Sequence, residues 1–310
     1  MAKKGGNNAL AWAVLVTGLL LTAGGALTFM KYHGLFGELG EMMDENGFPD
    51  LPSLKPDTVK ISDADTWVEF IDVGQADCAL VCSEGHYMLI DTGDRDDSDM
   101  VIAHLDAIGV EKLDYMILSH PHADHIGEAA DIYDSFEVGS VIMPQVPEGL
   151  EPDSVTYEML TETAPYIEPA ADMSFTFGEC TFDTYAAHEY TEDLNDMSVI
   201  VRLICGDCSF LFTGDCGENE EQEMLDRGVM LDSDVLKAGH HGSAYSSCEE
   251  WLSAVTPKYT VISCGAFNEY GHPDEAALKR LDGWSDEVFI TSRDGSIVFE
   301  TDGKDIAVIR

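Results

Sequence analysis

Short runs in which apolar and polar residues alternate fill the chain from residue 67 onward, and Gly, Asp or Asn bounds most of them. This alternation predicts β-strands, and apolar positions that recur every three or four residues predict helices. The predicted strands cover residues 67–73, 78–83, 86–91, 113–118, 139–143, 173–177, 180–186, 198–205, 208–213, 234–237 and 259–264, and three short strands close the chain. The predicted helices cover residues 98–109, 126–135, 218–227, 248–254 and 274–282.

Strands outnumber helices and come in runs, which is typical of an α/β fold with packed sheets that helices cover. Residues 144–172 are rich in Pro and acidic side chains and show no clear period. We interpret them as a loop that borders a substrate cleft, because long unpatterned loops in compact domains are often functional.

The N-terminal region has a different pattern. Residues 9–30 contain no charged side chain, and basic residues flank them on both sides. This length can span a bilayer, and the positive flank favours a cytoplasmic N-terminus. Gly24 and Ala26 also fit a signal-peptide cleavage site. The sequence therefore predicts a transmembrane anchor or a signal peptide in residues 1–30, with the length favouring the anchor, then a linker over 31–66 and a domain over 67–310.

In either case the domain is exported, and we expect it at the cell membrane, facing away from the cytoplasm, or secreted. The chain carries 16 Lys and Arg against 59 Asp and Glu, a net charge of −43. Because nucleic-acid affinity depends on basic side chains at phosphates, this balance excludes strong non-specific binding to nucleic acid. It indicates a solvated acidic surface.

Eight Cys then belong to a compartment that permits disulfides. Their pairing does not follow from the sequence. Cys205 and Cys208 flank Gly206-Asp207 between two alternating runs, which predicts a hairpin turn. A disulfide across that turn and two unpaired strand residues both remain open.

The strongest chemical signal is the run His120-Pro121-His122-Ala123-Asp124-His125, which follows the apolar stretch 113–118. Imidazole and carboxylate are the ligands that Zn²⁺ prefers. His120 and His122 share one face of an extended backbone, whereas Asp124 and His125 lie where a helix begins. One loop can thus present two ligand pairs, as two metals about 3.5–4 Å apart require.

Further motifs give this run a family context. The run H-x-H-x-D-H after a strand resembles the metallo-β-lactamase superfamily. The segments 68–77 and 89–93 resemble the opening strands of its ComEC/Rec2 competence branch, and Thr213-Gly214-Asp215 resembles the strand end with a metal-bridging Asp. Residues 235–243 and 268–273 resemble two later signatures of that branch. The resemblance implies a four-layer αββα sandwich with metals at one edge between the sheets.

The resemblance also implies a ligand set for two Zn²⁺ ions, with manganese as the alternative. The expected ligands are His120, His122, Asp124, His125, His188, Asp215 and His240. His241 is the alternative to His240, because adjacent side chains diverge in extended backbone. Oxygen-reducing di-iron relatives carry Glu where His122 stands, which favours zinc.

The expected catalytic residues are Asp124, which orients a metal-activated hydroxide, and His241 or His272, which protonates the leaving group. A role of His272 in the turn alone is the alternative. We expect Asp72 and Asp91, and with less support Asp77, to orient the His ligands by hydrogen bonds.

The predicted function is an exported binuclear hydrolase that acts on phosphoesters, as a phosphodiesterase or nuclease. Its substrate would be a polynucleotide or an envelope polymer that bears phosphorylcholine, and its membrane contact would be the N-terminal helix. A non-catalytic metal-binding module of a DNA-uptake or envelope complex is the alternative from another class. Hydrolysis of β-lactams ranks third, because the motifs after His125 fit the competence branch better.

Overall fold

The structure is a computed structural model that describes residues 61–95, 98–147, 149–150, 152, 154–167, 173–187 and 191–309. The predicted apolar segment over 9–30 lies outside these residues, as does the linker up to residue 60. Within the described part of the chain, no helix is both long enough and apolar enough to cross a membrane.

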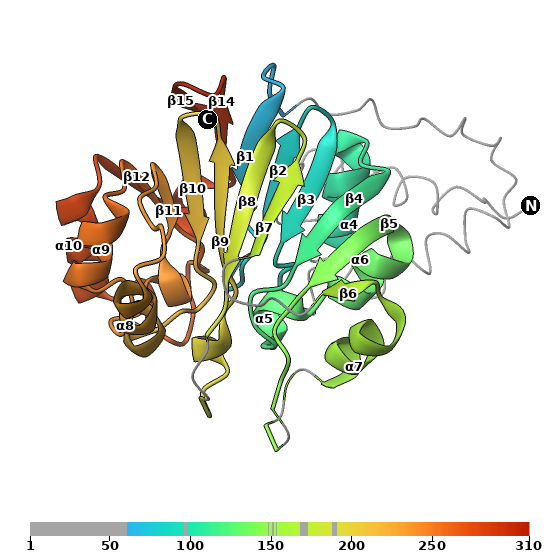
Figure 1. Ribbon diagram of the computed structural model, residues 1–310, viewed down its shortest axis with the longest axis horizontal. Helices are drawn as coiled ribbons and strands as arrows, with labels where there is room; N and C mark the ends of the chain where they lie inside the picture. Colours follow the sequence, from blue (N-terminus) through green and yellow to red (C-terminus); the bar gives the residue numbers. More distant parts are fainter. Residues whose placement is uncertain are drawn as a thin grey trace, which may run out of the picture. The chain divides into compact units, whose positions relative to one another are not determined.

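Two β-sheets lie face to face (Figure 1). The order of strands in the first sheet is β15 (Ile306–Ile309), β14 (Ile297–Thr301), β1 (Thr66–Phe70), β2 (Ala79–Ser83), β3 (His86–Ile90), β4 (Lys112–Ile117), β5 (Glu137–Ile142) and β6 (Tyr166–Ile167). The order in the second sheet is β13 (Glu287–Ile290), β12 (Tyr259–Ile262), β11 (Val235–Lys237), β10 (Cys208–Phe212), β9 (Ile200–Cys205), β8 (Cys180–Tyr185) and β7 (Met173–Phe177).

Each sheet has an antiparallel and a parallel part. The strands from β3 to β6 run parallel in the first sheet, and those from β10 to β13 run parallel in the second. Ligand sites in α/β folds lie beyond the carboxyl ends of parallel strands. The loops that follow β3, β4, β10, β11 and β12 carry the residues of the site described below.

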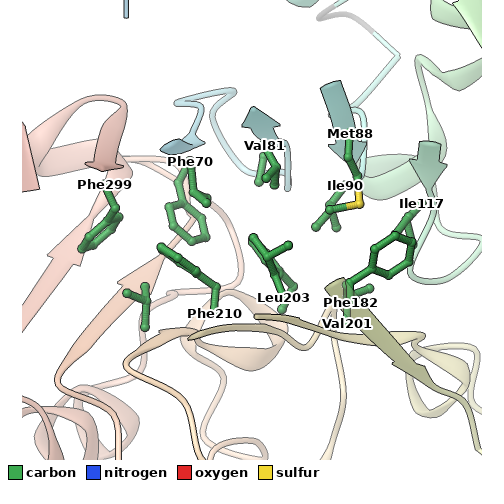
Figure 2. Packing of buried hydrophobic residues seen from close by; sticks show 14 of the residues in the cluster. Phe70, Val81, Met88, Ile90, Ile117, Phe182, Val201, Leu203, Phe210 and Phe299 are labelled. Carbon is green, nitrogen blue, oxygen red and sulfur yellow. The ribbon is translucent and has the colours of Figure 1, made fainter. Parts of the chain in front are cut away.

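Aromatic and branched side chains fill the space between the sheets (Figure 2). Phe70 of the first sheet stacks on Phe212 of the second with ring centroids 5.5 Å apart, and Phe182 and Phe210 are fully buried in the same layer. Alternate residues of each strand point into this layer and the others face the helices, so central strands such as β2 and β10 are buried on both faces.

Helices cover the outer face of each sheet. The helices of the described chain are α4 (Ser98–Ile108), α5 (Ala123–Ile126), α6 (Ala129–Ser135), α7 (Ser154–Thr163), α8 (Glu218–Arg227), α9 (Glu249–Val255), α10 (Glu275–Trp284) and α11 (Thr291–Asp294), with 3₁₀ turns η1 (Asn195–Met197) and η2 (Gly239–Gly242). Leu105, Ile132 and Leu160 pack against the first sheet, and Met224 and Trp251 against the second. The predicted two-sheet α/β architecture is confirmed.

Three expectations need correction. The region 144–172 contains α7 and β6 rather than one loop, because Leu160 packs into the outer core although acidic neighbours hide the period. The predicted helix over 126–135 is two short helices that separate at Gly127, where a side chain would collide with backbone. Cys205 forms a disulfide with Cys180 on neighbouring β8, and Cys208 across the hairpin is a free thiol.

Candidate metal centre

The loop between β4 and α5 carries His120, His122, Asp124 and His125. His122 has extended backbone (φ −83°, ψ 153°) and precedes the first turn of α5, so the two later residues lie on a helical turn. This change of backbone sends the two pairs of side chains in different directions. His120 and His125 are fully buried, whereas Asp124 is partly accessible. Burial of so many polar groups requires partners.

Asp91, at the end of β3, holds this loop in place. Its carboxylate accepts hydrogen bonds from the Ser119 backbone N–H at 2.7 Å and the Ser119 hydroxyl at 2.8 Å. It also accepts from His125 Nδ1 at 2.9 Å. Because Nδ1 of His125 donates to a carboxylate, its Nε2 lone pair is free to face the site, as in carboxylate–histidine–metal arrangements. The predicted orienting role of Asp91 therefore has a matching geometry.

Asp215 enters from the end of β10, after Gly214. The left-handed backbone of Gly214 (φ 50°) lets the strand end lie against Ser119, since a Cβ there would be 2.6 Å from the Ser119 Cβ. The backbone N–H of Asp215 donates to the Ser198 hydroxyl at 3.0 Å. Asp215 Oδ1 lies 3.2 Å from His125 Nε2, and Oδ2 lies 3.9 Å from His120 Nε2. One buried carboxylate thus faces both histidines.

His240 and His241 follow β11, and both have left-handed backbone, with φ of 48° and 52°. His241 is buried, and its Nε2 lies 3.2 Å from Asp124 Oδ2 and 3.6 Å from Asp215 Oδ1. Its Nδ1–H donates to the Ser263 carbonyl at 2.9 Å. The side chain of His240 is 32% exposed, with Nε2 3.7 Å from Asp215 Oδ2. The backbone is not extended, so both rings reach Asp215 from the same turn.

The donors form two groups that share Asp215. Ligand atoms of Asp124, His125, Asp215 and His241 all lie within 4.8 Å of one another. The other group starts from His120 Nε2 and His122 Nδ1, which are 3.0 Å apart. The atoms of His240 and His120 face Asp215 Oδ2, whereas those of His125 and His241 face Oδ1.

Two buried atoms indicate what the first group is suited to hold. His125 Nε2 and Asp215 Oδ1 are both enclosed, and neither has a hydrogen-bond partner among the described residues. They nevertheless lie only 3.2 Å apart. A histidine nitrogen and a carboxylate oxygen that converge in an enclosed space are arranged as two ligands of one cation would be, and a proton on Nε2 takes the place of that cation in the metal-free protein. The residues present therefore fit a metal ion.

Asp77, Asp91 and His125 form a further cluster of close ligand atoms. Lys237 Nζ lies 2.7 Å from Asp77 Oδ2, and both residues are buried. An ammonium group therefore already neutralises this carboxylate. Asp77 Oδ1 lies 3.4 Å from His241 Nδ1, so Asp77 supports the ring of His241 from behind.

The charges of the site shift several pKa values. Burial alone would lower the pKa of His241, but Asp215, Asp77 and a hydrogen bond to Asp124 raise it to about 10. Burial is likewise outweighed at His125, where Asp215 and Asp91 raise the pKa well above its usual value. Burial and the neighbouring His125 hold the pKa of His120 well below the usual value. Without metal, His241 is therefore positively charged at neutral pH, and the raised pKa of His125 favours its charged form as well.

The remaining predicted residues have varied positions. His188 lies outside the described residues. Asp72 accepts from the Gly74 N–H at 3.3 Å within its own turn. The His272 ring lies 5.4 Å from that of His240 and 6.2 Å from that of His241, between centroids.

A surface opening of about 510 Å³ adjoins His122. Its lining also includes Leu150, Glu192, Asp193 and Leu194. Leu150 belongs to the region that the sequence predicts as a border of the cleft, and it does line this opening. The two acidic residues give the walls a negative character.

Sequence reasoning missed Lys237 and three serines that support the site. Lys237 lies in an apolar strand, and a charge inside such a run is a signal of a buried ion pair. The Ser119 N–H donates to Asp91, and the Ser198 hydroxyl accepts from the Asp215 N–H. The Ser263 carbonyl accepts from His241 Nδ1. Their residue type carries no comparable signal, and Ser263 acts only through its backbone carbonyl.

Comparison with known proteins places these motifs in context. The metallo-beta-lactamase superfamily matches residues 71–266. ComE operon protein 3 of Bacillus subtilis (strain 168) is 29% identical over 258 residues, which cover 75% of this chain and 32% of that protein. Competence protein ComA of Neisseria gonorrhoeae is 30% identical over 250 residues, 80% of this chain and 34% of that protein. The chain thus spans about a third of the length of these relatives.

Solved structures show the same fold at low identity. CmlA, a diiron β-hydroxylase from Streptomyces venezuelae, superposes with a TM-score of 0.54 at 15% identity, over 78% of this chain and 55% of that one. Tm1679, a metal-dependent hydrolase of the beta-lactamase superfamily, gives 0.50 at 12% identity, over 76% of this chain and 99% of that one. The competence relatives agree with the branch that the sequence motifs resemble.

Proposed function

Because the chain belongs to the metallo-beta-lactamase superfamily, we propose that it is a binuclear metal-dependent hydrolase that cleaves phosphoester bonds outside the cytoplasm. The observation that carries this proposal is the position of Asp215. Its two carboxylate oxygens face two separate groups of histidines, as a residue that bridges two cations must.

One cation would be held by Asp124, His125, Asp215 and His241, whose ligand atoms already converge. The second would be held by His120, His122 and the other oxygen of Asp215, with His240 or His188 completing the set. In this proposal His241, which the sequence offers as the alternative to His240, is a ligand of the first cation. When bound, the cations supply an activated water near neutral pH and stabilise negative charge on the substrate.

The protein's own residues prepare the ligands. Asp91 holds Nδ1 of His125, and the Ser263 carbonyl holds Nδ1 of His241. Both rings therefore present Nε2 to the site in a fixed tautomer. Asp124 lies at the accessible side of the cluster, where it can also orient a nucleophile. His272 stands at the edge of His240 and His241, in reach of a leaving group.

The donor set favours zinc over iron. Imidazole nitrogens outnumber carboxylates in it, and such sets suit zinc better than carboxylate-rich iron centres. Manganese is the alternative for the second cation, beside His122 and the partly exposed His240, where water would have access.

For the substrate, the competence relatives favour a polynucleotide, whereas two observations favour an envelope polymer. Glu192 and Asp193 line the opening beside His122, and the chain has a net charge of −43. Both repel a polyanion and suit a substrate with a cationic substituent such as phosphorylcholine. The apolar residues 9–30 would tether the domain to the membrane or direct its secretion.

The test combines metal analysis with turnover of bis(p-nitrophenyl) phosphate, single-stranded DNA and p-nitrophenyl phosphorylcholine by zinc-loaded protein. We expect two zinc ions per chain and hydrolysis of at least one of the three. His120→Ala should remove hydrolysis, whereas His86→Ala, a surface histidine paired with Asp114, should not. Tight zinc binding without turnover of any ester would support the binding module instead.

A further inference from the structure

The segment between β12 and α10 is folded back on itself by one side chain. The Asn268 amide donates from Nδ2 to the carbonyls of Gly265 at 2.8 Å and His272 at 2.6 Å. Its Oδ1 accepts from the His272 backbone N–H at 2.9 Å. A single amide therefore satisfies backbone groups at both ends of this segment, which we call the Gly265–His272 loop.

The Gly265–His272 loop is also fastened at both ends. The Gly265 N–H donates to Gln75 Oε1 at 3.0 Å, and Gln75 lies between β1 and β2 of the other sheet. Just beyond the loop, the Asp274 N–H donates to the Gly242 carbonyl at 2.9 Å. These contacts fix the backbone of His272 relative to the turn that carries His240 and His241.

The ring of His272 is held by two neighbouring aromatic rings. Tyr270 stacks on it with centroids 5.8 Å apart, and the ring of His240 meets it edge-on. Its Nδ1 is enclosed and finds no hydrogen-bond partner in the part of the chain that the structure describes. A proton on Nδ1 would have no acceptor, at an appreciable energetic cost. The enclosed Nδ1 therefore favours the neutral tautomer with its proton on Nε2, because this tautomer leaves only a lone pair and not an N–H without a partner.

We propose that Asn268 is a positioning residue that fixes His272 as an Nε2–H hydrogen-bond donor to a substrate oxygen at the metal centre. This inference rests on the proposed hydrolase function. Asn268 acts through the backbone of His272 and touches neither metal nor substrate. Gln75 supports the same loop from the opposite sheet.

The kinetic test uses the full zinc-loaded chain and the phosphoester that the wild type hydrolyses best. His272→Ala removes one donor to the reacting group and should lower kcat/KM by about 100- to 1,000-fold. Asn268→Ala displaces the ring and should lower it by roughly 10- to 100-fold. In the His272→Ala background, Asn268→Ala should add less than about twofold, because effects that share one path are not additive.

A second readout does not depend on turnover. The ¹⁵N shifts of the imidazole should show His272 as the Nε2–H tautomer in the wild type, and a mixture of tautomers in Asn268→Ala. The zinc content should stay at the wild-type value in both single variants. Asn219→Ala is the matched control, because the Asn219 amide also donates a hydrogen bond, to the Asp196 carboxylate at 3.2 Å, but lies on α8 and not in the Gly265–His272 loop.

Several outcomes would overturn the proposal. Loss of zinc in His272→Ala would make His272 a metal ligand and not a donor to the substrate. An Nδ1–H tautomer in the wild type, or full additivity of the two substitutions, would also contradict the proposal. If Asn268→Ala does not fold, Gln75→Ala must show the same tautomer change and the same non-additivity. If the wild type hydrolyses no ester, the proposed function fails, whereas the tautomer measurement still decides the positioning role.

Discussion

Zinc binding should depend steeply on pH, because protons occupy the ligands of the metal-free protein. The carboxylates around His241 raise its pKa to about 10, and those around His125 raise its pKa well above the usual value. Both rings are fixed with Nδ1 protonated, so the extra proton is on Nε2, the atom that faces the site. Zinc must displace both of these protons.

The magnitude follows from the pKa of His241. Removing its proton at pH 7 costs about 4 kcal/mol, since each pH unit below a pKa of about 10 is worth about 1.4 kcal/mol. The proton of His241 alone should make the logarithm of the zinc association constant rise by about one for each pH unit, and His125 adds to this slope wherever it is protonated. Between pH 6 and pH 8 the affinity should therefore increase by at least about 100-fold.

The assay is competition with a chelator of known pH dependence, together with calorimetry in buffers of different ionisation enthalpy to count released protons. His241→Asn should reduce the slope by about one, because one displaced proton is lost. The control His86→Asn changes a histidine that is 55% exposed in its side chain and lies elsewhere on the first sheet, and it should leave the slope unchanged. A slope below one in the wild type would refute the assignment of His125 and His241 as protonated ligands.

Protonation of His241 should also make the stability of the metal-free protein depend on pH. The pKa of His241 in the folded state, about 10, lies above the usual 6.5. The protonated His241 ring therefore stabilises the folded state fully below pH 6.5, and this stabilisation is lost as the pH rises through about 10. Urea unfolding should therefore show the free energy of unfolding falling by on the order of 5 kcal/mol across this window. A flat profile from pH 6.5 to pH 10 would contradict the charge arrangement.

Three further predictions concern single residues. His241→Ala should lose the zinc ion at Asp124, as located by anomalous diffraction, whereas His240→Ala should keep it; loss of that ion in His240→Ala instead would make His240 its ligand. Lys237→Met leaves the buried Asp77 without its ammonium partner and should reduce the free energy of unfolding by about 3–5 kcal/mol in urea. An equally large loss in the exposed control Lys112→Met would refute the reasoning. Gly214→Ala places a Cβ 2.6 Å from the Ser119 side chain at a φ of 50°, so thermal unfolding should show a loss of roughly 2–5 kcal/mol, and wild-type stability would argue against this close approach.

Much of the fold was predictable because its strands are short apolar runs bounded by turn residues, and both faces of the central strands are buried. Phe210 and Phe212 point into the layer between the sheets, and Leu211 points to the helices. The helix α7 was missed, because few of its residues are buried and acidic side chains surround Leu160. The disulfide between Cys180 and Cys205 was not predictable, because it depends on the register of β8 against β9 and not on spacing in the sequence.

The site divides in the same way. The ligand run before α5 and Asp215 follow strand ends, where the sequence signal is direct. The choice between His240 and His241 depends on left-handed backbone in η2, and a pattern of residue types does not encode that conformation at non-glycine positions. The contacts of Lys237 with Asp77 and of Asn268 with His272 join segments whose pairing only the fold reveals.

The most direct test of the central claim is anomalous X-ray diffraction at the zinc edge from crystals of the zinc-loaded protein. Two peaks about 3.5–4 Å apart, each in contact with a different oxygen of Asp215, are the predicted result. The absence of any peak near Asp215, or a single peak coordinated without it, would contradict the proposed binuclear centre.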